Sequence, residues 1–134
     1  MNTTRLSVAL LLVIALSASL AQAGMMPGKM TGMLMGAKDH HASGTVTLVK
    51  ENGHATLRLD DLNVDKVPDG RVYLAHNGDY ADGVELGKLT QFSGTVQFAI
   101  PAAVNPAAYD SVVIWCKQFS VEIGRAALHT GDAM

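Results

Sequence analysis

Residues 91–101 read QFSGTVQFAIP, and this stretch has the cleanest two-residue alternation in the chain. Apolar or small residues fall on one face and polar residues on the other, in the sets Phe92, Gly94, Val96, Phe98 and Ile100 against Gln91, Ser93, Thr95 and Gln97. A period of two predicts a β-strand with one buried face. Pro101 ends this strand, because proline cannot donate a hydrogen bond to a sheet.

Upstream of this stretch, TVTLVK, ENGH and ATLRLD predict a β-hairpin. Asn52-Gly53 suits its turn because both central positions of a type I′ turn require positive φ. The expected buried face of the hairpin comprises Val46, Leu48, Ala55, Leu57 and Leu59. Further strands are predicted at about 71–76 and 84–89, with NGDYADG at 77–83 as a loop between them.

Downstream, SVVIWCK at 111–117 is apolar on both faces, which is typical of a central strand covered on both sides. Alternation places Cys116 on one face with Val112 and Ile114, and Trp115 on the other with Val113. Phe119, Val121 and Ile123 alternate again, Gly124 is expected to turn the chain, and 126–129 should form a short final strand. Seven or eight strands without an amphipathic helix predict an all-β fold, an antiparallel β-sandwich or a partly closed barrel.

The first 23 residues have the features of a secretory signal peptide. Arg5 precedes an uncharged apolar run, and Ala21-Gln22-Ala23 matches an A-x-A cleavage pattern. The run is short for a spanning helix, which needs ~20 apolar residues. We therefore expect a periplasmic or secreted protein without a stable membrane anchor.

Four segments follow from these patterns: the signal peptide at 1–23, a Met/Gly-rich flexible lead-in at 24–41, one β domain at 42–129 and a tail at 130–134. Without Arg5, nine basic residues face 12 acidic ones, a formal charge of −3. This balance argues against nucleic acid as a partner. A single cysteine rules out an intramolecular disulfide, so the hydrophobic core must hold the domain.

The search for chemistry finds no familiar enzyme signature, with G-x-S-x-G, H-E-x-x-H and C-x-x-C-H all missing. At most we expect a redox carrier. Asp79, Asp82 and Glu85 could offer oxygens to Ca²⁺, although acidic residues beside glycine are ordinary turn formers. Among the histidines, His54 and His76 fit solvated positions, whereas His129 could approach the thiol if its strand packs near 111–117.

The lead-in carries five methionines and a histidine pair that together could bind copper, because thioether sulfur selects Cu(I). These residues are Met25, Met26, Met30, Met33, Met35, His40 and His41. An irregular linker that happens to be rich in methionine is the favoured alternative, since compositional signals are weak.

Cys116 has two interpretations. A thiol among aliphatic neighbours behaves as a small core hydrophobe. However, Cys116 closes its predicted strand and Lys117 follows it, so the sulfur could lie at the rim of the sheet, where a cationic neighbour or an iron atom could reach it.

Six segments resemble the DM13 domain in content and order: HASG, LRLDDLNV, PDGRVYLAH, ELGKLTQFSGTVQFAIP, the Tyr109-Asp110 pair and SVVIWCKQFSVEIGRAAL. The resemblance implies a small β-rich extracytoplasmic module for electron transfer, whose characteristic cysteine is a free redox thiol or a ligand of haem or another metal. On this chain that residue is Cys116. A separate redox partner protein would then be required. The alternative is a non-enzymatic module that binds a protein or small ligand, with Cys116 in its core.

Overall fold

The computed structural model describes residues 28–130, which form nine β-strands and a single 3-10 turn at Pro106–Ala108. The strands are β1 (Lys29–Gly36), β2 (Ala42–Glu51), β3 (His54–Val64), β4 (Gly70–His76), β5 (Asp79–Lys88), β6 (Ser93–Ile100), β7 (Ser111–Cys116), β8 (Val121–Ala127) and β9 (His129–Thr130). The predicted all-β class is therefore confirmed.

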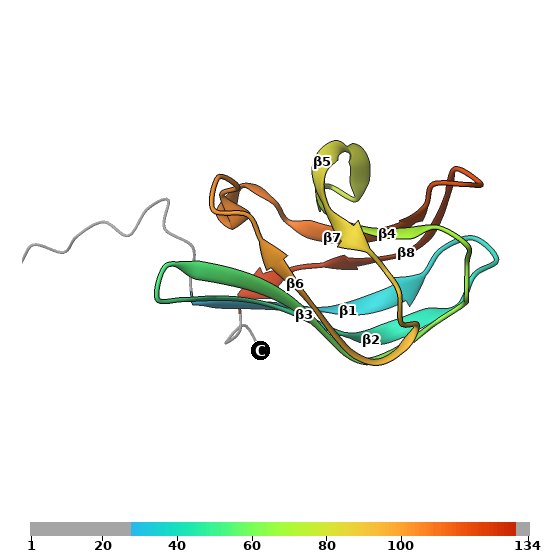
Figure 1. Ribbon diagram of the computed structural model, residues 1–134, viewed down its shortest axis with the longest axis horizontal. Coiled ribbons are helices and arrows are strands. Elements are labelled where there is room, and N and C mark those ends of the chain that lie inside the picture. The colour runs from blue at the N-terminus through green and yellow to red at the C-terminus, as the bar shows by residue number, and fades with distance from the viewer. Residues whose placement is uncertain (1–27, 131–134) are drawn as a thin grey trace, which may run out of the picture.

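The strands pair antiparallel in the order β5-β4-β7-β8-β1-β2-β3-β6, and β9 pairs with β1 as well. This sheet curls on itself into a half-barrel (Figure 1). Of the two predicted architectures, the partly closed barrel is the one that the chain adopts. Its core is the inner surface of the curl, filled by inward side chains of both halves of the sheet.

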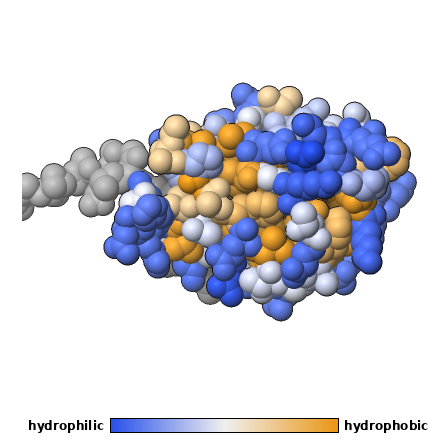
Figure 2. Space-filling view, in the orientation of Figure 1, coloured by the Kyte–Doolittle hydropathy of each residue, from blue (hydrophilic) through white to orange (hydrophobic). Residues whose placement is uncertain are grey.

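The barrel stays open between its edge strands, because within residues 28–130 no ladder pairing joins β5 to β6. The two edges nevertheless approach each other, since a Cβ atom on Gly87 would lie 3.2 Å from the ring of Phe98. Figure 2 shows an apolar zone across the middle of the face in view, between hydrophilic borders. Partly buried side chains of both edge strands pack on the core, namely Val84 and Leu86 of β5 and Val96 and Phe98 of β6.

The central hairpin forms as predicted. β2 pairs with β3 through a turn in which Asn52 has φ 52° and Gly53 has φ 80°, the positive values that a type I′ turn requires. Its expected inner face is buried, with Val46, Leu48, Leu57 and Leu59 closed to solvent and Ala55 half-buried. The alternation in 91–101 likewise becomes β6, whose Val96, Phe98 and Ile100 face inward.

Two predicted irregular segments are in fact strands. The prediction of a flexible lead-in at 24–41 is wrong over Lys29–Gly36, which form β1. This strand lies between β2 and β8 and pairs with the backbone hydrogen-bonding groups at their edges. The predicted loop at 77–83 is wrong from Asp79 onward. Asn77 and Gly78, with φ 52° and 75°, make a second tight turn, and β5 begins directly after it.

The C-terminal prediction needs a similar correction. Gly124 does not turn the chain but lies inside β8, where a Cβ atom would meet Cβ of Ala42 at 2.7 Å. The strand expected at 126–129 is divided, because β8 ends at Ala127 and β9 starts at His129. The proposed signal peptide lies outside the described residues, as does nearly all of the proposed tail.

Candidate functional site

Cys116 is the last residue of β7 and faces the core. Its side chain is 0% exposed and belongs to the main apolar cluster with Val112 and Ile114. Trp115 points the other way and packs with Val113 in a separate cluster on the outer face. The predicted division of β7 into two apolar faces is therefore confirmed, and between core and rim the structure places the thiol in the core.

A glycine lies directly across from the thiol. Gly70 on β4 pairs with Cys116, and the neighbouring pair is joined by a hydrogen bond from Lys117 N to Asp69 O (2.9 Å). Gly70 and Cys116 therefore form a non-hydrogen-bonded pair, the type in which side chains on opposite strands come closest. Because Gly70 has no side chain, side chains from other segments occupy the space beside it on the inner face.

Three apolar side chains cover that space. A Cβ atom on Gly70 would lie 3.1 Å from Val67, 3.7 Å from Leu89 and 3.9 Å from Phe92. Leu89 is buried, whereas Val67 and Phe92 are half-buried and belong to the connections before β4 and before β6. The thiol is thus separated from solvent by loop side chains at the end of the barrel that carries the β7–β8 turn, on the right in Figure 1.

A charged network lies on the outer face at the same end. Arg71 donates from Nε to Asp69 Oδ1 and from Nη1 to Glu85 Oε2, both at 2.7 Å. Glu85 Oε1 also accepts from the Tyr73 hydroxyl (3.3 Å) and lies 3.6 Å from Lys117 Nζ. Lys117, which follows the cysteine, is therefore directed to the outer face, away from the thiol.

The network shifts the pKa values of its two carboxylates and of the Tyr73 phenol. The hydrogen bond from Arg71 lowers the pKa of Asp69. Burial acts to raise the pKa of Glu85, but the hydrogen bond and charge of Arg71, with Lys117, outweigh burial and hold that pKa below its ordinary value. Burial, followed by the negative charge of Glu85, raises the pKa of the Tyr73 phenol.

Three aromatic rings stack beside the network. Tyr80 and Trp115 are parallel with centroids 3.7 Å apart, and Tyr73 meets Tyr80 edge-on at 5.4 Å. The sequence pattern alone predicts neither group, because it indicates a loop at 77–83 and places Tyr80 outside the strands. The signal that could have found them is Asn77-Gly78, which repeats the turn dipeptide of the first hairpin and places Tyr80 and Glu85 on the strand beside β4.

The other predicted candidates do not converge on Cys116. Ser111, the first residue of β7, pairs with Ala127, so His129 lies beyond the opposite end of that strand. Five strand residues span ~17 Å. The expected approach of His129 to the thiol is therefore wrong.

The possible calcium ligands are also dispersed. Asp79 begins β5 and accepts a hydrogen bond from Ala81 N, whereas Glu85 lies further along the same strand and accepts a hydrogen bond from Arg71. The extended strand keeps these two carboxylates apart. His54 is exposed, as predicted, and so is His76, whose ring lies 5.6 Å from that of Tyr109.

The proposed copper tract is divided by β1. Met25 and Met26 lie outside the described residues. Met30 is directed inward against the core, whereas Met33 and Met35 are exposed on the outer face. In the β1–β2 connection, His40 Nδ1 lies 3.6 Å from Asp65 Oδ2.

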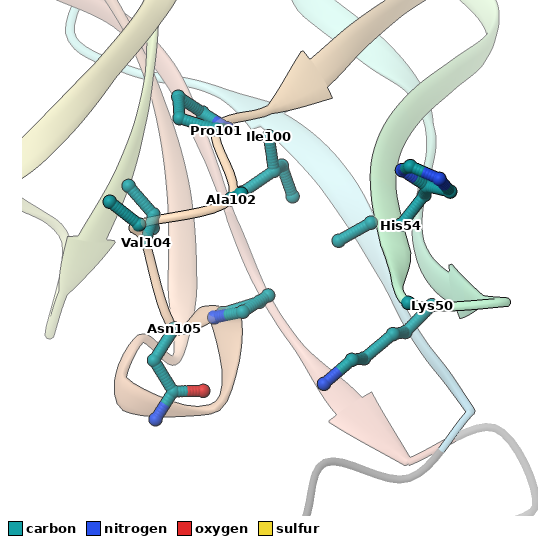
Figure 3. Close-up of a pocket in the computed structure, with 11 residues that line it drawn as sticks. Lys50, His54, Ile100, Pro101, Ala102, Val104 and Asn105 are labelled. Atoms are coloured by element: carbon teal, nitrogen blue, oxygen red, sulfur yellow. The ribbon is translucent and has the colours of Figure 1, made fainter.

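The packing around Cys116 does not fit a haem. Small-molecule sites are clefts or cavities of about 300–1,000 Å³, whereas the sulfur here is fully buried among the aliphatic side chains of the core. The pocket in Figure 3 (about 270 Å³) lies at the other end of the barrel, where Lys50 extends toward the loop that carries Asn105. Within residues 28–130, no group of three or more His, Cys, Asp or Glu side chains is placed to hold a metal ion.

Comparison with known proteins identifies a family. A family model described as Electron transfer DM13 matches residues 34–128. No curated protein and no solved structure matches the chain. Over the part of the chain that the structure describes, no helix is long and apolar enough to cross a membrane.

Proposed function

This chain belongs to the DM13 electron transfer family, and on that premise we propose that it is an exported redox accessory whose working group is the Cys116 thiol. The family supports a redox role of this general kind. The features of residues 1–23 support export. The observation that carries the assignment to Cys116 is its position as the only thiol of the chain, at the end of a central strand and opposite a glycine.

The proposed thiol works from a closed resting state. Burial in the apolar cluster protects it, and reaction requires local opening of the loop side chains that cover it. Such sub-global openings need less free energy than complete unfolding. The turn after Cys116 is exposed and contains Ser120 at φ 51°, so the covering end of the barrel consists largely of loop and turn residues.

The chemistry is thiol–disulfide exchange with a partner protein. After losing its proton to water, Cys116 attacks one sulfur of a partner disulfide. A mixed disulfide forms, the partner's S–S bond breaks, and its electron pair leaves with the second partner sulfur as a thiolate. Because this chain has no second cysteine, a thiol of a partner must release Cys116 again.

Two matched valine variants test local opening. Val67 covers the thiol end of the core, and Val104 is equally half-buried against the same core at the other end. Removing two methyl groups from a half-buried valine costs the closed state about 1 kcal/mol. We expect Val67→Ala to raise the rate of labelling by a small aromatic disulfide about fivefold, and Val104→Ala to leave it near the wild-type rate.

Equal acceleration in both variants, in proportion to their loss of global stability, would show that the thiol reacts only through complete unfolding. This outcome would favour the second candidate function, a binding module in which Cys116 is core. That candidate is supported by the complete burial of the sulfur and by the pocket at the opposite end of the barrel.

A further inference from the structure

The outer face of β1 carries two thioethers in a row. Met33 and Met35 are 68% and 66% exposed, whereas Met30 and Leu34 on the same strand turn inward. Alternate residues on one face of a strand are about 6.7 Å apart. Because methionine has three rotatable bonds in its flexible side chain, the two sulfurs can reach a common point above the sheet.

A histidine from the far end of the chain joins this face. β9 pairs with β1 so that His129 lies opposite Thr31, and β8 pairs with β1 so that Arg125 lies opposite Met35. The two pairings have the same offset, and the pairing of His129 with Thr31 puts His129 on the same face as Met33 and diagonal to it. Diagonal neighbours in a sheet are about 7–8 Å apart between backbones, within reach of long side chains.

The position between these donors is hollow. The same register sets Ala127 opposite Met33, and its side chain is too short to fill the space. A pocket of about 350 Å³ results, and Met33, Met35, Ala127 and His129 are among the residues that line it. Its lining residues come from β1, β2, β8 and β9. Figure 1 shows the course of β1 beside β2 and β8.

We propose that Met33, Met35 and His129 form a Cu(I)-binding site. Two thioethers and one imidazole are a soft donor set, and thioether sulfur selects Cu(I) among the biological metals. No carboxylate lines the pocket, so it does not offer the oxygen ligands that Ca²⁺ and Mg²⁺ require. The site lies outside the barrel, whereas Cys116 lies within it, and it is therefore independent of the proposed thiol function.

The cation that pairs across from Met35 is already bound by a carboxylate. Arg125 is opposite Met35, but its guanidinium donates twice to Glu122 at 2.7 Å. Its Nη1 also lies beside Gly78. Gly78 belongs to the turn between β4 and β5, which is separated from β8 by β7 in the sheet. The positive charge is thus neutralised and directed away from the two sulfurs.

This donor set differs from the one that composition suggested. Composition groups the methionines with the adjacent pair His40-His41, but His40 is directed toward Asp65 and Met30 toward the core. Strand pairing instead brings in His129, about 95 residues away along the chain.

The test is anaerobic titration of the purified chain with Cu(I) in competition with a chromogenic chelator. We expect one Cu(I) per chain from this site and movement of the His129 ring signals in the NMR spectrum. Met33→Leu, Met35→Leu and His129→Gln should each weaken binding about tenfold or more, because removal of even an outer-shell partner of a metal ligand costs about 10–100-fold in affinity. All three positions are exposed, and circular dichroism verifies that the variants fold.

Matched controls locate the metal. Met30→Leu changes an inward methionine of the same strand and His54→Gln an exposed histidine elsewhere, and both should bind as wild type. Met25→Leu with Met26→Leu, and Cys116→Ser, should also retain this binding. The proposal is overturned if the Met33, Met35 and His129 triple variant still binds Cu(I) with wild-type affinity, if no Cu(I) binds, or if only the Met25/Met26 or Cys116 variants lose it.

Discussion

Cys116→Ser replaces a sulfur that packs among aliphatic side chains with a hydroxyl of similar size. Burying a hydroxyl in apolar surroundings costs about 1–3 kcal/mol when its hydrogen bonds to water are not replaced. We therefore expect the free energy of unfolding to fall by about that amount, measured by urea denaturation. Cys116→Ala, which adds no polar group, should cost less than Cys116→Ser. Equal stability of Cys116→Ser and the wild type would mean that the side chain at 116 is solvated.

At the residue scale, alternation predicted which face each side chain of β7 occupies, since the side-chain period of a strand is fixed at two. The choice between core and rim was not predictable. It depends on Val67 and Phe92, which belong to loops distant in sequence, and on the absence of a side chain at Gly70. Likewise, His129 could be placed only once its pairing with β1 was known.

Among the elements, β1 was the one that its own sequence gave no reason to expect. Glycine is depleted in strands, and MTGMLMG combines it with flexible methionines. The strand forms because two neighbouring strands offer it hydrogen bonds and because its glycine permits a close approach. A Cβ atom at Gly32 would collide with the backbone carbonyl of Ala127.

Gly32→Ala should therefore separate β1 from the C-terminal strands. Overpacking of this kind costs about 1–3 kcal/mol, and we expect that loss in the free energy of unfolding measured by urea denaturation. Gly28→Ala is the control, because a Cβ atom there meets nothing within 4 Å, and it should stay within about 0.5 kcal/mol of wild type. Similar stabilities of the two variants would show that β1 and Ala127 can move apart without cost.

For the molecule as a whole, the network around Arg71 predicts acid sensitivity. The pKa values of Asp69 and Glu85 are lowered by folding, so their contribution is complete above the ordinary values of 3.8 and 4.5. That contribution is lost as pH falls through the lower folded-state values. We expect Glu85→Gln to be less stable than wild type near pH 7 and to lose less stability on acidification below pH 4.5, measured by urea denaturation across pH.

Glu51→Gln is the control for this series, because Glu51 is exposed at the β2–β3 turn, far from Arg71. It should follow the wild-type pH dependence. An unchanged acid response in Glu85→Gln would argue that the ion pairs across β4, β5 and β7 contribute nothing to folding.

The fold class was predictable at this scale because short alternating segments recur along the whole chain. Whether they form two packed sheets or one curled sheet was not. That choice depends on two residue pairs between β1 and β8 and on the approach of Gly87 to Phe98, contacts that local patterns do not encode.

The central position of β1 has a consequence for the order of folding. Met35 pairs with Arg125, so β1 cannot form this pairing until a strand about 90 residues later in the chain is available. Closing so long a loop is slow, and contacts of this range lower folding rates. A chain that emerges amino terminus first, from a ribosome or through a membrane pore, can form its β2–β3 hairpin early. It cannot complete the sheet until almost its entire length is free.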